Sequence, residues 1–333
     1  MSPFRALPLA ALMLGPLGAA VSASAAPAFV LEWGGNGTGP GQFIRPFGLD
    51  LDDVGTLYVV DILGGRLQTF DASGTRLGGW GPFGSPSDVA VDDAADVVYV
   101  TDYLGHVLLR FRRDGTPLGG WGQLGSGTDD FRNPGGVTVD AQGIVYVSDT
   151  FNHRIKKIAA DGQVLDIWGG PDAGSGAGQF DRPFGIAIDG SGDVYVADNQ
   201  NHRVQKLTSD GQPILEWGSF GTGGGEFDWA FDVAVGPAGD RVWVVDRNND
   251  RVEEFTPDGT FLSSWGQGGR GPGEFAAPTD VIVAADGSVF VADYANDRIQ
   301  KFRDSAVGIG GALRDASWGI VKGGYRSPAG PGR

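Results

Sequence analysis

Short apolar runs alternate with Gly-rich polar stretches along most of this chain. The runs at 184–189 (FGIAID), 193–198 (DVYVAD) and 202–207 (HRVQKL) place apolar side chains on alternate positions. This is the period of a β-strand, because successive side chains point to opposite faces of a sheet. The Gly-rich breaks between the runs predict tight turns. The pattern therefore predicts an all-β fold made of many short strands.

The same order of predicted strands recurs along the chain. A Trp-Gly dipeptide ends each unit, and its spacings are 47, 41, 47, 49 and 48 residues, with the Trp at Trp33, Trp80, Trp121, Trp168, Trp217 and Trp265. Each full unit holds four predicted strands. Units of this length and strand number are typical of a β-propeller, whose blades pack on one another around a central axis.

The last unit lacks its fourth strand. Elsewhere a Trp stands 14 residues after the start of the third strand, as Trp217 does after Arg203, but the residue 14 after Arg298 is Ala312. Residues 29–34 (FVLEWG) match a fourth strand and have no first three strands before them. We therefore predict six four-stranded blades, with the N-terminal strand pairing in the last blade. The alternative is closure by residues 312–319 (ALRDASWG).

The units also share a motif. It runs P-x-G/D-V/I-x-V/I-D, then V/L-Y-V-x-D, then N-H/D-R-I/V-x-K, as at 183–189, 194–198 and 201–206. This motif resembles that of the NHL-repeat six-bladed β-propellers, here of a secreted bacterial type. The resemblance implies a propeller domain over 26–303. It implies no single activity, because the family includes scaffolds, RNA binders and enzymes.

An Asp and an Arg five residues apart recur in five of the six units. In a β-hairpin this spacing places the Asp at the end of one strand and the Arg at the start of the next, so that the carboxylate accepts turn N–H groups and pairs with the guanidinium. A pair built five times predicts architecture rather than catalysis. In the second unit Val107 takes the place of the Arg after Asp102, and we expect that hairpin to be the least fixed.

The chain has three histidines, His106, His153 and His202, at one hairpin position in three successive units. Zinc–nitrogen distances are ~2.0–2.1 Å, so ligands of one ion lie within a few ångströms of each other. Facing sheets lie ~10 Å apart. A zinc ion shared by these histidines is therefore not expected. Asp250 and Asp297 occupy the position in the last two units, which predicts a solvated turn.

Phenylalanines end the Gly-rich loops that precede five of the units. No helix with a Lys-Ser/Thr start follows these loops, so they are not phosphate loops. We predict that these rings fill the gaps between blades, with the repeated Trp doing the same further out. The residues are Phe43, Phe131, Phe180, Phe227 and Phe275.

In a propeller the loops that lead into the innermost strands meet at one mouth of the axial channel. Two residues after the Pro of this loop, or after its Ala230 counterpart, stand Asp88, Asp232 and Asp280, and one residue before it stand Arg45 and Arg182. Carboxylates suit a hard cation such as Ca²⁺, and Arg can hold a carboxylate or phosphate by bidentate contact. These five residues are the candidate ligand site, with the aspartates as candidate metal ligands. The alternative is that each Asp caps its own strand and each Arg covers an aromatic ring.

The first 25 residues resemble a secretory signal. Arg5 precedes a mostly apolar stretch, and Ala23-Ser24-Ala25 fits a small-residue cleavage site, so a mature chain from Ala26 is predicted. A membrane anchor is the alternative, although the apolar run is short for a span of ~20 residues. No later segment is apolar enough to span a bilayer, and the chain has no Cys. The predicted location is therefore secreted or periplasmic, without disulfides.

The chain is strongly acidic. Its formal net charge is −16, and removal of Arg5 with the signal would make it −17. Such a charge disfavours nucleic acid as a partner. The near-uniform repeat predicts a monomeric binding module for a protein, peptide or glycan, rather than an enzyme. The alternatives are a metal-dependent hydrolase or lyase, lactonase-like, at the channel mouth, and a cell-envelope role in which the Pro/Gly-rich tail (304–333) attaches the domain.

Overall fold

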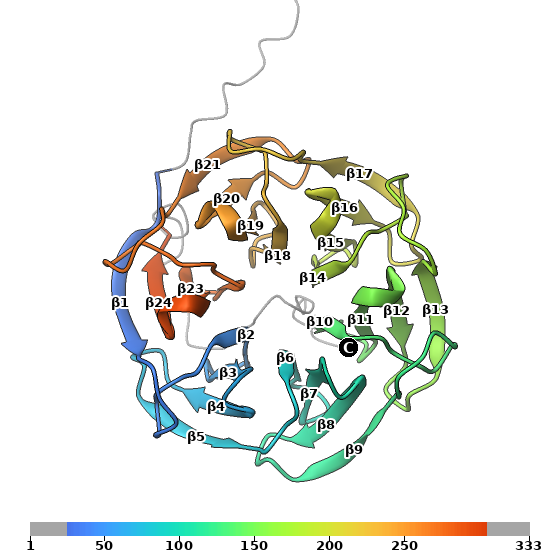
Figure 1. Ribbon diagram of the computed structural model, residues 1–333, viewed down its shortest axis with the longest axis horizontal. Helices are drawn as coiled ribbons and strands as arrows, with labels where there is room; N and C mark the ends of the chain where they lie inside the picture. Colours follow the sequence, from blue (N-terminus) through green and yellow to red (C-terminus); the bar gives the residue numbers. More distant parts are fainter. Residues whose placement is uncertain (1–24, 305–333) are drawn as a thin grey trace, which may run out of the picture.

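The computed structural model describes residues 25–304, and within them the chain forms six antiparallel four-stranded sheets. The sheets stand as blades around a central axis (Figure 1). This confirms the all-β, six-bladed propeller predicted from the repeat. The residues before Ala25 and after Asp304 lie outside the described range. The predictions of a signal peptide and of a C-terminal tail therefore fall outside it as well.

The strands occupy equivalent places in each blade. The innermost strands are β2 (Pro46–Leu51), β6 (Pro86–Asp92), β10 (Pro134–Val139), β14 (Pro183–Ile188), β18 (Ala230–Val235) and β22 (Asp280–Val283). The second strands are β3 (Leu57–Asp61), β7 (Val97–Asp102), β11 (Val145–Asp149), β15 (Val194–Asp198), β19 (Val242–Asp246) and β23 (Ser288–Asp293). The third strands are β4 (Arg66–Phe70), β8 (Val107–Arg112), β12 (Arg154–Ile158), β16 (Arg203–Leu207), β20 (Arg251–Phe255) and β24 (Arg298–Arg303).

The outer strands form the rim of the disc (Figure 1). They are β5 (Arg76–Trp80), β9 (Pro117–Trp121), β13 (Val164–Gly169), β17 (Pro213–Trp217), β21 (Phe261–Trp265) and, in the last blade, β1 (Ala28–Gly34). Four short 3₁₀ helices join the second and third strands of blades 3 to 6, namely η1 (Thr150–Asn152), η2 (Asn199–Asn201), η3 (Arg247–Asn249) and η4 (Tyr294–Asn296). No helix within 25–304 is long and apolar enough to cross a membrane.

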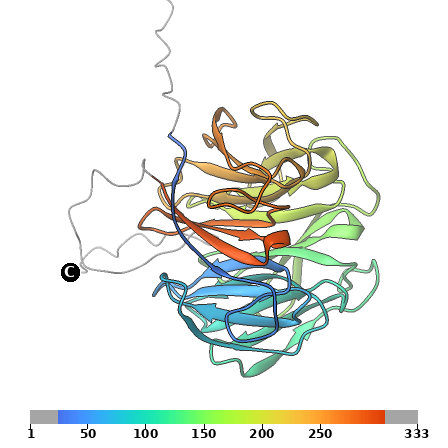
Figure 2. The same ribbon diagram turned by 60° about the vertical axis from the view of Figure 1, so that its left-hand side comes forward.

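The N-terminal strand closes the ring. Strand β1 pairs antiparallel with β24, from Ala28 opposite Arg303 to Gly34 opposite Arg298. Figure 2 shows β1 lying along the last blade. The Arg298 guanidinium also donates to Glu32 Oε2 at 2.7 Å, which adds a charged contact to the strand pairing. The predicted closure by residues 29–34 is confirmed, and the alternative segment 312–319 lies outside the described residues.

The blades are held together by apolar side chains that lie between neighbouring sheets. The loop phenylalanines are at most 1% exposed, as predicted. Phe43, for example, packs against apolar residues of both blade 1 and blade 6. Trp33 lies further out in the same gap, with its ring 5.9 Å from that of Phe70 and 6.2 Å from that of Phe290. Burying a side chain of this size contributes about 1.5–3 kcal/mol.

The repeated Asp–Arg pair is architectural. In all five predicted hairpins the Arg Nε donates to the Asp carboxylate, at distances from 2.7 Å (Arg154 to Asp149) to 3.0 Å (Arg66 to Asp61). The same guanidinium reaches the carbonyls of the Gly-rich loop, as Arg154 does at Ser126 (3.0 Å). In blade 2, Asp102 accepts hydrogen bonds from backbone N–H groups alone. That its hairpin is the least fixed stays a prediction.

Candidate functional site

The loops that lead into the innermost strands and the hairpins between the second and third strands lie on one face of the disc. At this mouth of the channel the residue before the Pro, or before its Ala counterpart, has a left-handed backbone in five blades. The φ values are 69° at Arg45, 53° at Asn133, 51° at Arg182, 69° at Trp229 and 49° at Ala277. Non-glycine residues adopt this region rarely, so each loop must be held by its surroundings.

The histidines provide part of that hold. Each His Nδ1 accepts a hydrogen bond from the left-handed residue of the next blade, as His202 does from Trp229 N at 3.2 Å. The equivalent aspartates do the same, and Asp297 Oδ1 accepts from Arg45 N at 2.9 Å. The solvated turn predicted for this position is therefore wrong, because the side chain joins two blades. We call these contacts, made by His106, His153, His202, Asp250 and Asp297, the blade clamps.

The three predicted aspartates also join neighbouring blades. Each is at most 4% exposed, and its carboxylate accepts a hydrogen bond from the innermost strand of the following blade. The donors are Val137 N to Asp88 (2.9 Å), Val281 N to Asp232 (3.1 Å) and Leu49 N to Asp280 (3.1 Å). The alternative predicted that each Asp caps its own strand, but these three hydrogen bonds reach the strand of the following blade instead.

Glycines make room for these carboxylates. A Cβ added at Gly185 would lie 2.2 Å from Asp232 Oδ1, and one added at Gly48 would lie 2.5 Å from Asp88 Oδ1. Within residues 25–304, no three His, Cys, Asp or Glu side chains are grouped as metal ligands. The calcium hypothesis therefore rests on the sequence pattern alone.

Aromatic rings from three blades meet at the axis. Phe47, Phe184 and Phe231 come from the innermost strands of blades 1, 4 and 5, and each is less than 10% exposed. Phe184 stacks on Phe231 with 4.4 Å between ring centroids, and Phe47 lies 5.7 Å from both. Tyr294 of η4 adds an edge contact to Phe47 at 5.6 Å. We call these four rings the aromatic plug.

An arginine that sequence reasoning missed lies on the aromatic plug. The Arg247 guanidinium, at the start of η3, lies 4.4 Å from the ring centroid of Phe231, 4.9 Å from that of Tyr294 and 5.8 Å from that of Phe47. Burial lowers the pKa of Arg247 from its ordinary value. Within the described residues no carboxylate forms an ion pair with it. Its departure from the repeat, at a hairpin position held by Thr150, Asn199 and Tyr294 in other blades, was the available signal.

The two predicted arginines lie at the same mouth. Arg45 stacks over Tyr294, with its guanidinium carbon 5.0 Å from the ring centroid, and so shares that ring with Arg247. Arg182 lies over Phe151 of blade 3 at 4.9 Å and is exposed. Arg45, Arg182 and Arg247 form what we call the arginine rim. Chemically this arrangement offers guanidinium donors above an apolar floor, which suits a carboxylate or phosphate oxygen.

The sequence matches two described families. Residues 131–158 and 180–207 match the NHL repeat, and residues 234–304 match a family described as a 6-bladed beta-propeller. The matched segments fall in blades 3 to 6, and they agree with the resemblance carried by the repeated motif. No curated protein matches the sequence of this chain.

Several solved structures are similar in fold. Virginiamycin B lyase from Staphylococcus aureus superposes with a TM-score of 0.58 at 14% identity, covering 82% of this chain and 98% of that one. A gluconolactonase from Xanthomonas campestris superposes with a TM-score of 0.61 at 16% identity, and the match covers 87% of this chain and 99% of that one. An auxiliary nutrient binding protein from Bacteroides thetaiotaomicron superposes with a TM-score of 0.62 at 13% identity, and the match covers 78% of this chain and 69% of that one. At these identities the similarity shows the fold alone.

Proposed function

We propose that this six-bladed propeller with NHL repeats is an exported binding protein that holds a carboxylate-bearing ligand at the arginine rim. The observation that carries the proposal is Arg247, a guanidinium set on three aromatic rings with no ion pair among residues 25–304. Arg247 is partly buried, and taking a cation out of water is costly unless a counter-charge compensates it. A ligand carboxylate would supply that charge.

The surroundings support the same chemistry. Arg45 and Arg182 come from blades 1 and 4, on opposite sides of the ring, so the rim can contact a ligand from two directions. Three arginines at one mouth are notable in a chain of formal net charge −16, because a net negative charge disfavours the approach of anions. The rim would therefore supply local positive charge for an anionic group at this mouth.

The fold neighbours are consistent with either binding or catalysis, since they include a nutrient binding protein, a lyase and a gluconolactonase. The metal-dependent hydrolase or lyase alternative would need a ligand group for a metal, and none is formed by side chains of residues 25–304. No observation in the described part of the chain favours that alternative. We therefore place binding first.

The test is isothermal titration with paired acidic and neutral probes. Trigalacturonate and hexaglutamate carry carboxylates, and maltotriose and hexaglutamine are their neutral counterparts. We expect at least one acidic probe to bind and its neutral counterpart to bind at least tenfold more weakly, since a charged hydrogen bond contributes about 1.5–3 kcal/mol. The Arg182→Gln and Arg247→Gln variants should each weaken that binding about tenfold or more.

Arg112→Gln is the matched control. Arg112 ends β8 on the opposite face and its side chain is 55% exposed, so its loss removes one charge far from the mouth. If no acidic probe binds, or if Arg182→Gln and Arg247→Gln bind as Arg112→Gln does, the proposal is wrong. Arg182 is exposed and its substitution leaves the aromatic plug intact, so misfolding would not explain its result.

A further inference from the structure

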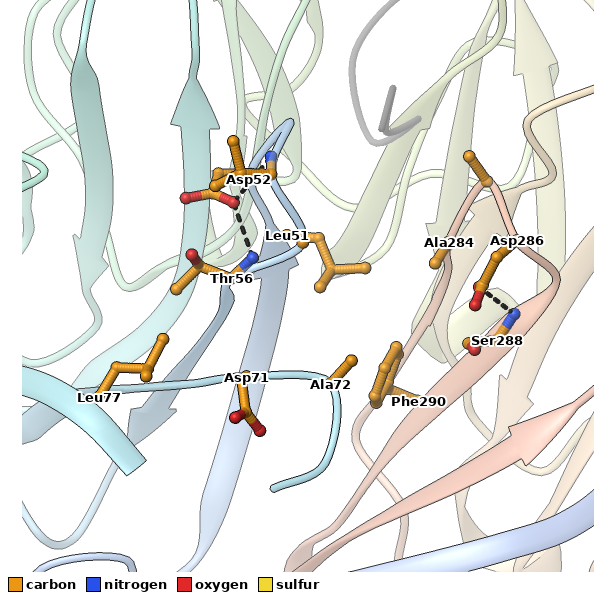
Figure 3. A pocket seen from close by; sticks show the side chains of 13 residues that line it. Leu51, Asp52, Thr56, Asp71, Ala72, Leu77, Ala284, Asp286, Ser288 and Phe290 are labelled. Atoms are coloured by element: carbon orange, nitrogen blue, oxygen red, sulfur yellow. Dashed lines mark hydrogen bonds between the residues drawn. The ribbon is translucent and has the colours of Figure 1, made fainter. Parts of the chain in front are cut away.

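A cavity lies on the opposite face of the disc, between the first and last blades. Its volume is about 190 Å³, and Figure 3 shows the side chains that line it. The walls come from the β2–β3 and β4–β5 turns of blade 1 and from the β22–β23 turn of blade 6, and they are mostly apolar. Leu51, Leu77, Ala284 and Phe290 supply much of the apolar surface.

The cavity lies where blade 6 departs from the repeat. In blades 1, 3 and 4 the carboxylate of an Asp after the innermost strand accepts a hydrogen bond from the hydroxyl of a Tyr on the second strand. The distance is 3.4 Å between Asp52 and Tyr58. The same contact joins Asp140 to Tyr146 (3.4 Å) and Asp189 to Tyr195 (3.3 Å). In blade 6 these two positions are Ala284 and Phe290. Both polar groups of the pair are missing, and both replacement residues line the cavity.

A buried polar atom also lines the cavity. Ser288 is 1% exposed, and among residues 25–304 its Oγ has no hydrogen-bond partner. A buried hydroxyl without a partner costs free energy that a bound ligand could recover. Ser288 follows Asp286 by two residues in the turn, and Asp286 Oδ1 accepts a hydrogen bond from Ser288 N at 2.8 Å. The backbone N–H of Ser288 therefore contacts this carboxylate, while its hydroxyl stays without a partner among residues 25–304.

The charged groups that line the cavity are all acidic. They are Asp52, Asp71 and Asp286. Asp52 is almost fully buried and pairs with Arg113 at 3.6 Å. Asp71 and Asp286 are partly exposed at the rim, where Asp286 lies 3.9 Å from the exposed Arg303, which does not line the cavity. Lys301 lies behind Phe290, where its Nζ donates to Ala72 O at 2.9 Å, and it does not line the cavity. The lining therefore favours a cation over an anion.

We propose that this cavity binds a compact apolar molecule carrying one ammonium group. A cavity of about 150 Å³ holds benzene, so this one accepts a single ring or a short branched chain. The apolar body would lie against Leu51, Ala284 and Phe290. The ammonium group would donate to Ser288 Oγ and to Asp286. The site lies on the other face from the arginine rim and does not depend on the function proposed there.

The test is a chemical-shift titration with benzylammonium, benzyl alcohol and benzoate, which share a ring and differ in charge. We expect benzylammonium to shift the amide signals of Ala284 and Ser288 with a dissociation constant of roughly 1 mM or less. Benzyl alcohol should bind roughly fivefold more weakly and benzoate more weakly still. Binding of all three with equal affinity would overturn the assignment of an ammonium ligand, and binding of none would overturn the site.

Three variants locate the binding. Ala284→Asp with Phe290→Tyr restores the pair found in blades 1, 3 and 4, so the protein should fold and the filled cavity should no longer bind. Ser288→Ala should weaken benzylammonium severalfold, and Asp286→Asn should remove the preference over benzyl alcohol. Asp114→Asn is the control, because Asp114 accepts from the amide two residues later (Thr116 N, 2.9 Å), as Asp286 does, but lies in the β8–β9 turn of blade 2 and does not line the cavity. Unchanged binding in the repeat-restored variant would show that the cavity is not the site.

Discussion

Glu253 is a carboxyl group at a position where the repeat favours glutamine. In blades 1, 4 and 6 a buried Gln both accepts from a loop glycine and donates to a loop carbonyl, as Gln205 does with Gly178 (2.9 Å) and Gln179 (2.7 Å). Glu253 accepts from Gly225 at 2.9 Å, but when ionised it has nothing to donate. Burial raises the pKa of Glu253 from its ordinary 4.5 to about 8, although Arg251 opposes that shift.

This pKa gives the sign of a stability change with pH. Between pH 4.5 and 8 the folded protein holds a proton at Glu253 that the unfolded chain has lost, so stability falls as the pH rises through this window. We expect Glu253→Gln to raise the free energy of unfolding by about 1–3 kcal/mol at pH 9 and by little at pH 5. Urea denaturation at the two pH values measures this.

Lys156 provides the matched comparison, because it occupies the same repeat position in blade 3. Burial lowers the pKa of Lys156 from 10.5 to about 8, so its cost is present below pH 8 and fades as the pH rises towards 10.5. Lys156→Gln should therefore show the opposite pH dependence. An equal gain at pH 5 and pH 9 for Glu253→Gln would mean that hydrogen bonding alone, and not ionisation, decides the effect.

The blade clamps act between elements. Two consecutive amides of the lead-in loop are held from different blades in every blade except the second, where Asp102 accepts from both amides. Asp198 of blade 4, for example, accepts from Asp181 N at 2.7 Å, while His153 of blade 3 accepts from Arg182 N at 3.2 Å. Such a contact fixes the loop and sets the angle between neighbouring blades. It also positions the arginine rim, because Arg45 and Arg182 are themselves clamped residues.

We expect an aspartate to serve as the hydrogen-bond acceptor in place of a blade-clamp histidine. His202→Asp should retain stability, since Asp250 accepts from Ala277 N at 2.7 Å in the next blade. His202→Ala should lower the free energy of unfolding by about 1–2 kcal/mol, because Trp229 N loses its acceptor. Thermal denaturation of both variants measures the difference. Equal losses in both would show that the imidazole ring, which packs on Phe220 at 5.0 Å, matters more than its acceptor atom.

At the scale of the whole molecule, the six blades form one ring whose ends meet in blade 6. Closure by β1 places blade 1 against blade 6 across the cavity described above. A ligand in that cavity would contact both blades, and binding to the folded ring alone would stabilise it in proportion to ligand concentration.

The calcium hypothesis is tested on the whole protein by elemental analysis after dialysis against a weak chelator. We expect no stoichiometric calcium, because the carboxylates of Asp88, Asp232 and Asp280 each accept a hydrogen bond from a backbone amide of the next blade. One retained equivalent that is lost in Asp280→Asn would establish a metal site at the mouth and would move the hydrolase or lyase alternative ahead of binding.

The sequence predicted what is decided within one blade. Alternation of apolar residues, turn glycines and the Asp–Arg spacing fix strands, hairpins and their pairs, because these contacts join residues close along the chain. The six-fold repeat with its displaced strand then fixed the number of blades and the closure. The loop phenylalanines were predictable as well, since one residue type at one repeat position had to meet the neighbouring blade.

The tertiary structure alone decided which residues of different blades meet. Arg45 and Arg182 were found by their departure from the repeat, but Arg247 and the aromatic plug needed the ring geometry that brings blades 1, 4, 5 and 6 together at the axis. The clamp position looked like an exposed turn because its partner lies 27 residues further on in the chain. The cavity beside blade 6 lies where Ala284 and Phe290 lack the carboxylate and the hydroxyl found in blades 1, 3 and 4. Whether such a gap is filled depends on how neighbouring blades pack.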